Sequence, residues 1–384
     1  MKILKSRAPK NDMPLMETNQ GIVLFHPHVP KNAIPYVTDT LNSRWIGHGP
    51  KVEKFELEFK SAFNLSGDCM AVGSGTDALH LGYLLADLSK DDEVLVPLFT
   101  CTATNIPLLY VGARLVFVDV DPKTLNLNVE DLRRKISART KMIVCVHYGG
   151  LPCDMDEIHE IANEYNVPVL EDAAHALGGK YNGKYIGEIS EYTMFSFQAI
   201  KHLTTGDGGM LVTRELGKEK FARRLRWFGI DREDKQKGVW ENDIKEIGYK
   251  YQMTDIAAAI GLAGLEEFND TLQYRRILFQ RYLTGLSGCP EVTIVQDQDP
   301  RKEHACWLFT ILVERRADLQ KRLRERGIES GQTHYRNDRY SIFDVQDEFP
   351  YMDTIDDKYL ILPLHTKMSL NDVDYVCAEI QKGW

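Results

Sequence analysis

The chain has 384 residues, of which 43% are hydrophobic and 27% are charged, which is typical of a globular protein with about two or three domains. Its net charge of -9 argues against nucleic acid or an anionic membrane as the main partner. The sequence contains no apolar run long enough to predict a membrane span. The seven cysteines include no Cys-x-x-Cys pair. Neither a metal site nor a disulfide framework is therefore expected, and a reducing cytoplasm is the expected location.

The N-terminal part begins with residues 1–20, which are polar and rich in helix breakers and so predict an irregular arm. Helices are expected over residues 31–42 and 51–63, the second because apolar residues recur along it at helical spacing. Between them runs a loop with two glycines, Arg44-Trp-Ile-Gly-His-Gly-Pro50. Its tryptophan either caps the core or lies beside a substrate.

A predicted anion site follows the short apolar run of residues 69–73. Ser74 turns the chain into a helix that starts with Gly75 and Thr76 and reaches about Leu88. Glycine permits close backbone approach, and the unpaired amides at a helix start carry positive partial charge, which suits a phosphate group. A helix cap without a ligand is the alternative. The dinucleotide and Walker glycine motifs are both absent from the sequence.

Four apolar runs predict buried strands, separated by amphipathic helices expected over residues 129–136 and 155–165. The strands are expected at residues 93–97, 115–120, 141–146 and 167–171. Strands that alternate with helices predict a mostly parallel sheet with helices on both faces. Asp154 is expected to cap the helix at 155–165.

A carboxylate and an imidazole follow the last of these strands, at Asp172 and His175. In an open α/β sheet, groups at the carboxyl ends of strands face the ligand crevice. An aspartate there can hold a pyridinium nitrogen protonated, and the imidazole can hydrogen-bond a phenolic oxygen beside it. Both features suit pyridoxal phosphate (PLP).

Ser196 lies within a further apolar run at residues 194–197, and Lys201 lies between that run and the next, at residues 210–213. Burial without a partner lowers the pKa of a lysine, and a neutral amine is a nucleophile suited to a Schiff base with a carbonyl. The alternative is a lysine that extends to solvent at a strand end. Together with Asp172 and Gly75, the pair favours a PLP site.

The remaining chain predicts a second, smaller domain. A helix is expected over residues 218–228, a charged loop over 231–237, and a long helix capped by Thr254. From about residue 265 the composition becomes more charged, with helices expected at 273–286, 319–326 and 370–382 and strands at 307–313 and 332–334. We therefore expect a large PLP-binding α/β domain over residues 21–264 and a small α+β domain over residues 265–384.

Two motifs, Glu171-Asp-Ala-Ala-His175 and Ser196-Phe-Gln-Ala-Ile-Lys201-His-Leu-Thr-Thr-Gly-Asp-Gly-Gly209, resemble the DegT/DnrJ/StrS family of sugar aminotransferases. The resemblance runs from about Phe25 to the C-terminus. It implies a fold-type I PLP enzyme in which Lys201 binds the cofactor covalently and Asp172 holds its ring nitrogen. It also implies transfer of an amino group from an amino acid, expected to be L-glutamate, to a nucleotide-linked keto-sugar, by a homodimer with shared active sites.

Three positions in two segments depart from the family pattern. Cys101 stands where the family carries an aromatic residue that stacks on the pyridine ring, so the stacking partner is left open. Lys250 and Gln252 stand where the family has asparagine and arginine, the asparagine reaching the phosphate of the neighbouring subunit's cofactor. A lysine can serve the same anion as a point charge.

Other functions within the family stay open at this stage. Some relatives are sugar dehydratases with histidine in place of Lys201, and a regulatory role has been assigned to others. The lysine itself and its pairing with Asp172 favour transamination. The choice of sugar is expected to depend on residues 47–50 and 334–340.

Overall fold

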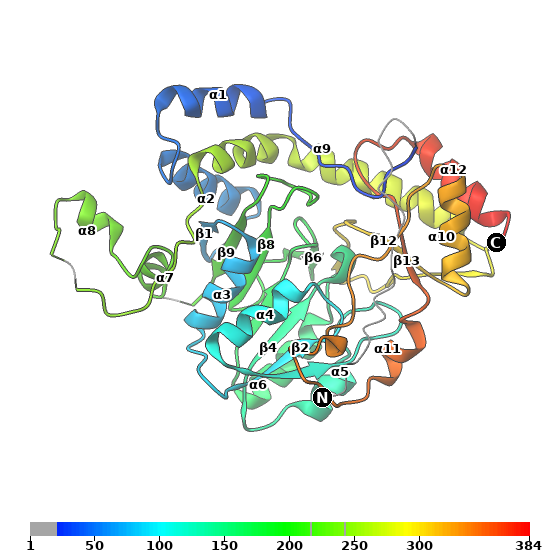
Figure 1. Cartoon of the computed structure of the whole chain (residues 1–384), viewed down its shortest axis with the longest axis horizontal. Coiled ribbons are helices and arrows are strands. Elements are labelled where there is room, and N and C mark those ends of the chain that lie inside the picture. The colour runs from blue at the N-terminus through cyan, green and yellow to red at the C-terminus, as the bar shows by residue number, and fades with distance from the viewer. Residues whose placement is uncertain (1–20, 216, 242) are drawn as a thin grey trace.

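The computed structural model describes residues 21–215, 217–241 and 243–384 (Figure 1). The predicted N-terminal arm, residues 1–20, lies outside this described part. A seven-stranded sheet forms the centre, in the order β1-β9-β8-β5-β4-β2-β3. Its strands are β1 (Asp68–Val72), β2 (Glu93–Pro97), β3 (Arg114–Val118), β4 (Thr140–Val146), β5 (Val169–Asp172), β8 (Tyr192–Ser196) and β9 (Gly209–Thr213). Strands β3, β2, β4, β5 and β8 pair in parallel, and β9 alone among the seven runs the other way, antiparallel to both β8 and β1, which confirms the mostly parallel sheet.

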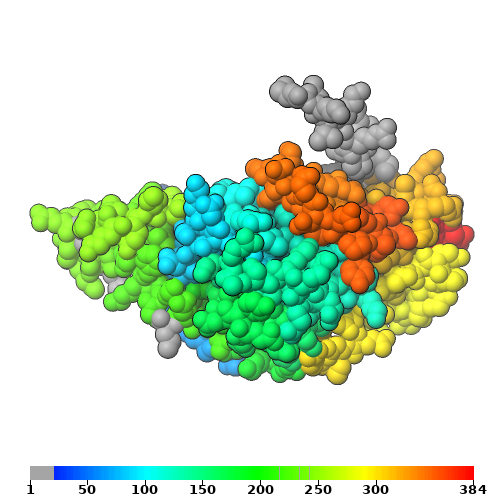
Figure 2. All heavy atoms as spheres, turned by 90° about the horizontal axis from the view of Figure 1, so that it is seen from below, coloured from blue at the N-terminus to red at the C-terminus, as the bar shows by residue number. Residues whose placement is uncertain are grey.

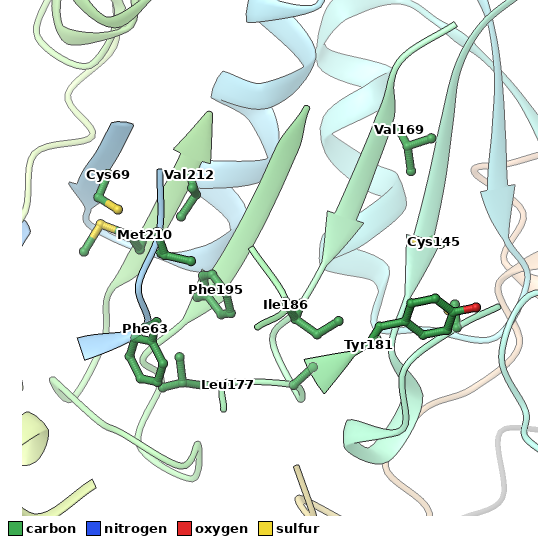
Figure 3. Close-up of a cluster of buried hydrophobic side chains, with 14 of the residues drawn as sticks. Phe63, Cys69, Cys145, Val169, Leu177, Tyr181, Ile186, Phe195, Met210 and Val212 are labelled. Atoms are coloured by element: carbon green, nitrogen blue, oxygen red, sulfur yellow. The ribbon is translucent and has the colours of Figure 1, made fainter. Parts of the chain in front are cut away.

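Alternate residues of each central strand enter different cores, because side chains along a strand point to opposite faces. In β9, Met210 and Val212 belong to one core and Leu211 to the other. Figure 3 shows part of the first core, where Phe195 of β8 lies between Met210 and Ile186. Both faces of the sheet are therefore buried, as a parallel sheet requires.

Helices cover these two faces (Figure 1). The first core receives α2 (Pro50–Ala62), α5 (Val129–Lys135), α6 (Met155–Tyr165) and the start of α9 (Asp255–Leu286). The second receives α3 (Gly75–Leu85), α4 (Thr102–Val111), α7 (Glu219–Leu225) and α11 (Pro350–Ile355). Helix α1 (Ala33–Ser43) lies against α9. None of the helices in the described part of the chain combines the length and the apolar character needed to cross a bilayer.

The C-terminal part forms its own sheet and core. Strands β10 (Val292–Ile294), β12 (Phe309–Val313) and β13 (Tyr359–Leu362) pair antiparallel, covered by α10 (Arg316–Glu325) and α12 (Leu370–Gln381). In a third sheet, β6 (Lys180–Tyr181) lies between β11 (Lys302–Glu303) and β7 (Lys184–Tyr185) and pairs with both. Helix α9 runs unbroken across residue 265, so the boundary that we propose between the two domains falls inside one helix.

Helix caps follow the expected chemistry in two of three places. The side chains of Ser74 and Thr254 accept hydrogen bonds from amides in the first turns of α3 and α9. Asp154 occupies the N-cap position of α6 but makes no capping hydrogen bond. Its carboxylate instead lies 2.7 Å from the Lys302 amine, because a buried cation attracts it away from the helix end.

Two predicted segments were wrong. Residues 332–334 form no strand; Gly331 makes a single bridge to Ile361 and Arg336 another to Phe99, because this segment crosses from the small sheet to the large one. The predicted charged loop contains a short helix, α8 (Arg232–Gln236), whose residues are good helix formers and which the Asp231 side chain caps. The segment that carries α8 projects from the body of the molecule (Figures 1 and 2).

Candidate active site

Lys201 lies in the loop between β8 and β9, which leads away from the carboxyl end of β8. Its Nζ is 3.7 Å from the ring centre of Trp307. The Trp307 indole donates a hydrogen bond of 3.1 Å to the Ile200 carbonyl, which fixes the ring against the loop. Burial lowers the pKa of Lys201 to about 8, while nearby Asp172 and Cys101 raise it. A substantial neutral fraction of the amine therefore exists near neutral pH.

Asp172 is the last residue of β5 and is buried. Its Oδ2 accepts a hydrogen bond of 2.7 Å from the Thr104 hydroxyl of α4, and its Oδ1 accepts one of 3.1 Å from the Ala174 amide. Burial raises the pKa of Asp172 above its ordinary value, although these hydrogen bonds and the charge of Lys201 oppose the rise. The structure thus brings the predicted carboxylate and amine into one electrostatic environment.

His175 follows Asp172 by three residues and lies in a stack of three rings. The Trp307 ring stacks on the His175 imidazole at a centroid distance of 3.8 Å. The His334 ring also stacks on the His175 imidazole, at a centroid distance of 5.2 Å and an interplanar angle of 5°. Burial holds the pKa of His175 well below its ordinary value, so the imidazole is neutral. Its Nδ1 accepts a hydrogen bond from the Gly149 amide, which leaves the proton on Nε2, ready to donate.

The start of α3 meets the end of β8 at Gly75 and Ser196. A Cβ on Gly75 would lie 3.1 Å from the Ser196 Cβ and 3.3 Å from its hydroxyl oxygen, so a larger residue would fill this approach. Thr76 follows in the first turn of the helix, where the amides carry positive partial charge. The two predicted phosphate-binding elements are therefore adjacent.

Cys101 and Lys250 lie in different surroundings. Cys101 is exposed at the N-cap of α4, close enough to affect the pKa of Lys201. Lys250 is exposed on a turn that bridges to Trp227, and its amine donates a hydrogen bond of 2.9 Å to the Gln252 side chain. The neighbouring Tyr251 carbonyl accepts from the Gly73 amide, so this turn lies beside the start of α3.

Three residues of this centre were not assigned to it from the sequence. Trp307 was predicted only as part of a strand, His334 was noted only within a specificity loop, and Thr104 was not considered. Each reaches the site from a segment remote in sequence from its partner. The available signal was that Thr104 follows a strand at the carboxyl edge, where a polar residue faces the crevice.

Comparison with protein families matches residues 27–381 to the DegT/DnrJ/EryC1/StrS aminotransferase family. The chain belongs to this family. Its members are PLP-dependent sugar aminotransferases, and solved relatives include a PLP form. The fold described above is that of a fold-type I aminotransferase.

Similar proteins include two from Escherichia coli and Bacillus subtilis and one of solved structure. GDP-perosamine synthase of Escherichia coli O157:H7 is 34% identical, over 94% of this chain and 98% of that one. The spore coat polysaccharide biosynthesis protein SpsC of Bacillus subtilis is 33% identical, over 92% and 95%. The sugar aminotransferase CalS13 from Micromonospora echinospora superposes with a TM-score of 0.90 at 32% identity, over 94% and 100%.

The residues of this family member fit PLP at both ends. A Cβ at Gly75 would crowd Ser196, so the missing side chain lets the first amides of α3 approach the Ser196 hydroxyl closely, and this convergence of donors suits a phosphate. At the other end, the buried Asp172 carboxylate and the Lys201 amine suit a pyridinium nitrogen and an aldehyde.

Proposed function

We propose that this protein transfers an amino group from L-glutamate to a nucleotide-linked keto-sugar in the biosynthesis of amino sugars for surface glycans. The observation that carries the proposal is the half-buried Lys201, whose amine has its pKa lowered to about 8, beside the buried Asp172 carboxylate. The printed functions of relatives, which include a GDP-linked sugar and a spore coat polysaccharide, support the substrate class.

Lys201 is the proposed catalytic amine. Its neutral amine would hold the cofactor and, when free, would take and return the proton that moves during transamination. Bound PLP supplies an electron sink for the negative charge that develops when that proton leaves. The Trp307 ring, 3.7 Å from the Lys201 amine, keeps water from one side of it.

Asp172 and His175 are proposed to set the charge of the cofactor ring. The Asp172 carboxylate would accept a hydrogen bond from the protonated ring nitrogen and so keep the ring positively charged. The Nε2–H of neutral His175 is proposed to donate to the phenolic oxygen. Its orientation is fixed because the Gly149 amide occupies Nδ1 and two rings cover its faces.

The phosphate is proposed to bind the amides of Gly75 and Thr76 and the Ser196 hydroxyl. Cys101, exposed beside Lys201, is proposed to lie against the pyridine ring in place of an aromatic residue. Lys250 is proposed to reach the cofactor of the second subunit of a homodimer. We also propose a cytoplasmic location, where both proposed substrates, a nucleotide sugar and glutamate, would be available.

The test is to incubate the purified holoenzyme with L-glutamate and a panel of nucleotide-linked keto-sugars. We expect 2-oxoglutarate and an amino sugar in equal amounts, detected by mass spectrometry, with Lys201→Ala as the inactive control. Release of water without transfer of an amine would identify dehydratase chemistry instead. No turnover with any sugar, by a preparation that carries PLP, would contradict the proposal.

A further inference from the structure

A chain of two buried hydroxyl groups leads to the Asp172 carboxylate. Thr100 follows β2, and Thr104 lies in the first turn of α4; they are 2% and 0% exposed. Their Oγ1 atoms are 2.8 Å apart, and Thr104 Oγ1 is 2.7 Å from Asp172 Oδ2. These distances are those of good hydroxyl hydrogen bonds.

The direction of the chain follows from the number of protons. An ionised carboxylate can only accept, so the single proton of the Thr104 hydroxyl points to Asp172. The hydrogen bond between the two threonines must then be donated by Thr100. Each hydroxyl is polarised by the next, which strengthens a chain of this kind in a buried place.

The surrounding structure holds this chain in position. The Thr104 carbonyl accepts a hydrogen bond of 2.8 Å from the Tyr83 hydroxyl of α3, and the Thr100 carbonyl accepts one of 2.8 Å from the Asn337 side chain. Helix α4 is thus tied to two other segments on either side of its first turn. The Thr104 hydroxyl cannot leave Asp172 without breaking buried contacts.

We propose that Thr100 and Thr104 are positioning residues that orient Asp172 and keep its carboxylate ionised toward the ring nitrogen of the cofactor. The inference rests on the proposed role of Asp172 and extends it to two residues that do not touch the cofactor. A protonated Asp172 could no longer hold the ring nitrogen as a cation, so the relay would protect the charge on which the reaction depends.

Several other groups near Asp172 either change its pKa or have their own pKa changed by it. Burial raises the pKa of Asp172, the Thr104 hydrogen bond is the first of the influences that lower it, and Lys201 and His147 lower it further. Asp172 in turn raises the pKa values of Tyr83 and Cys145, each after the effect of its own burial or hydrogen bond. Among the side chains named here as lowering the pKa of Asp172, Thr104 is the one that can be removed without changing a charge.

The decisive variant is Thr104→Val, which keeps the branched shape and removes the donor. A hydrogen bond to a charged acceptor is worth ~10- to 150-fold in equilibrium, so the acid limb of the kcat/KM profile should move upward by about 1–2 pH units. The dissociation constant for PLP, measured by titrating the apoprotein, should rise roughly tenfold by the same arithmetic. Thr104→Ser should restore both, and Thr100→Val should shift the acid limb by less than Thr104→Val.

A matched control is Thr40→Val, since Thr40 is also fully buried and donates one hydrogen bond, of 2.8 Å to the Tyr36 carbonyl of α1. It should lower stability without moving the acid limb. A Thr104→Val enzyme with the wild-type acid limb and PLP affinity would overturn the relay, as would a Thr104→Ser enzyme that behaves like Thr104→Val. If Asp172→Asn is impaired in that case, the proposed function stands and only the relay fails. If Asp172→Asn is also wild-type, both fail.

Discussion

The carboxyl edge of the sheet around Asp172 and the turn around Lys250 differ in how much of their surroundings one chain supplies. Asp172 is buried, and both of its carboxylate oxygens accept hydrogen bonds from elements of the same chain. Lys250 is exposed, and its amine donates to Gln252 on the same turn. The first group has its orientation and charge fixed when the chain folds. The second keeps its freedom until another surface meets it.

This difference indicates whether a substitution should affect activity within one subunit or through contact with another surface. A change at the sheet edge should act on chemistry within one subunit, because the partners of each group are already in place. A change at Lys250 should act through whatever docks on the turn, and its size should depend on assembly. Substitutions in the two regions can therefore be ranked by how much of the reaction they remove.

The largest effect is expected for Lys201→Ala. This change removes both the proposed nucleophile and the proton carrier, which act as a unit, so turnover should fall at least ~10⁴-fold. Amino-sugar formation by purified enzyme measures it, and circular dichroism checks that the fold is kept. Turnover close to the wild-type level would refute the catalytic role of Lys201 and remove the contrast between the two regions.

A smaller but large effect is expected for Asp172→Asn. The amide keeps the size of the side chain and loses the negative charge, so the ring nitrogen would no longer be held protonated. We expect turnover to fall about 10²- to 10³-fold, comparable to the loss of one preorganised electrostatic contact. Thermal unfolding should show a folded protein. An Asp172→Asn enzyme as fast as the wild type would mean that another group sets the charge of the ring.

The pH dependence of cofactor uptake tests the burial of the Lys201 amine. Burial lowers its pKa to about 8, and only the neutral form attacks an aldehyde. Below that pH the rate at which apoprotein takes up PLP should rise roughly tenfold per pH unit, and above it the rate should level off. Stopped-flow absorbance measures this rate. A rise that continues to the pKa of an ordinary lysine would show that the amine is not desolvated.

Much of the fold could be predicted because the strands are apolar runs with clear ends. Strand β2 and helix α6 have the predicted bounds, and the caps at Ser74 and Thr254 are made by side chains. The failures lie where sequence pattern and tertiary context disagree. The segment at residues 332–334 has strand-like composition but bridges two sheets, and α8 has no apolar face to reveal it.

The site was predictable to the extent that its groups follow strands. Asp172 and Ser196 end strands β5 and β8, so the parallel topology brings Lys201, in the loop after β8, to the same edge as Asp172. Trp307 could not be foreseen, because its contact with Ile200 joins residues 107 positions apart. Thr104 could not be foreseen for the same reason, because its hydroxyl, on α4, donates to the Asp172 carboxylate at the end of β5.

The smallest and most conditional effect is expected for Lys250→Ala. A phosphate held by the Gly75 and Thr76 amides still carries close to two negative charges, and one lysine near it is worth ~1–3 kcal/mol. Loss of the Lys250 amine should therefore weaken PLP retention roughly 5- to 150-fold. Lys250→Asn, which restores the residue usual in the family, should recover much of that loss. Titration of the apoproteins with PLP measures both.

The exposed position of Lys250 makes its control decisive. Lys321→Ala removes the same charge from an exposed position on α10 and should leave PLP affinity unchanged. If Lys250 acts across a subunit interface, the weakening should appear at protein concentrations where the homodimer persists and fade where it dissociates, as analytical ultracentrifugation can establish. Unchanged affinity in Lys250→Ala, with the dimer intact, would mean that this lysine only hydrogen-bonds Gln252 on a solvated turn.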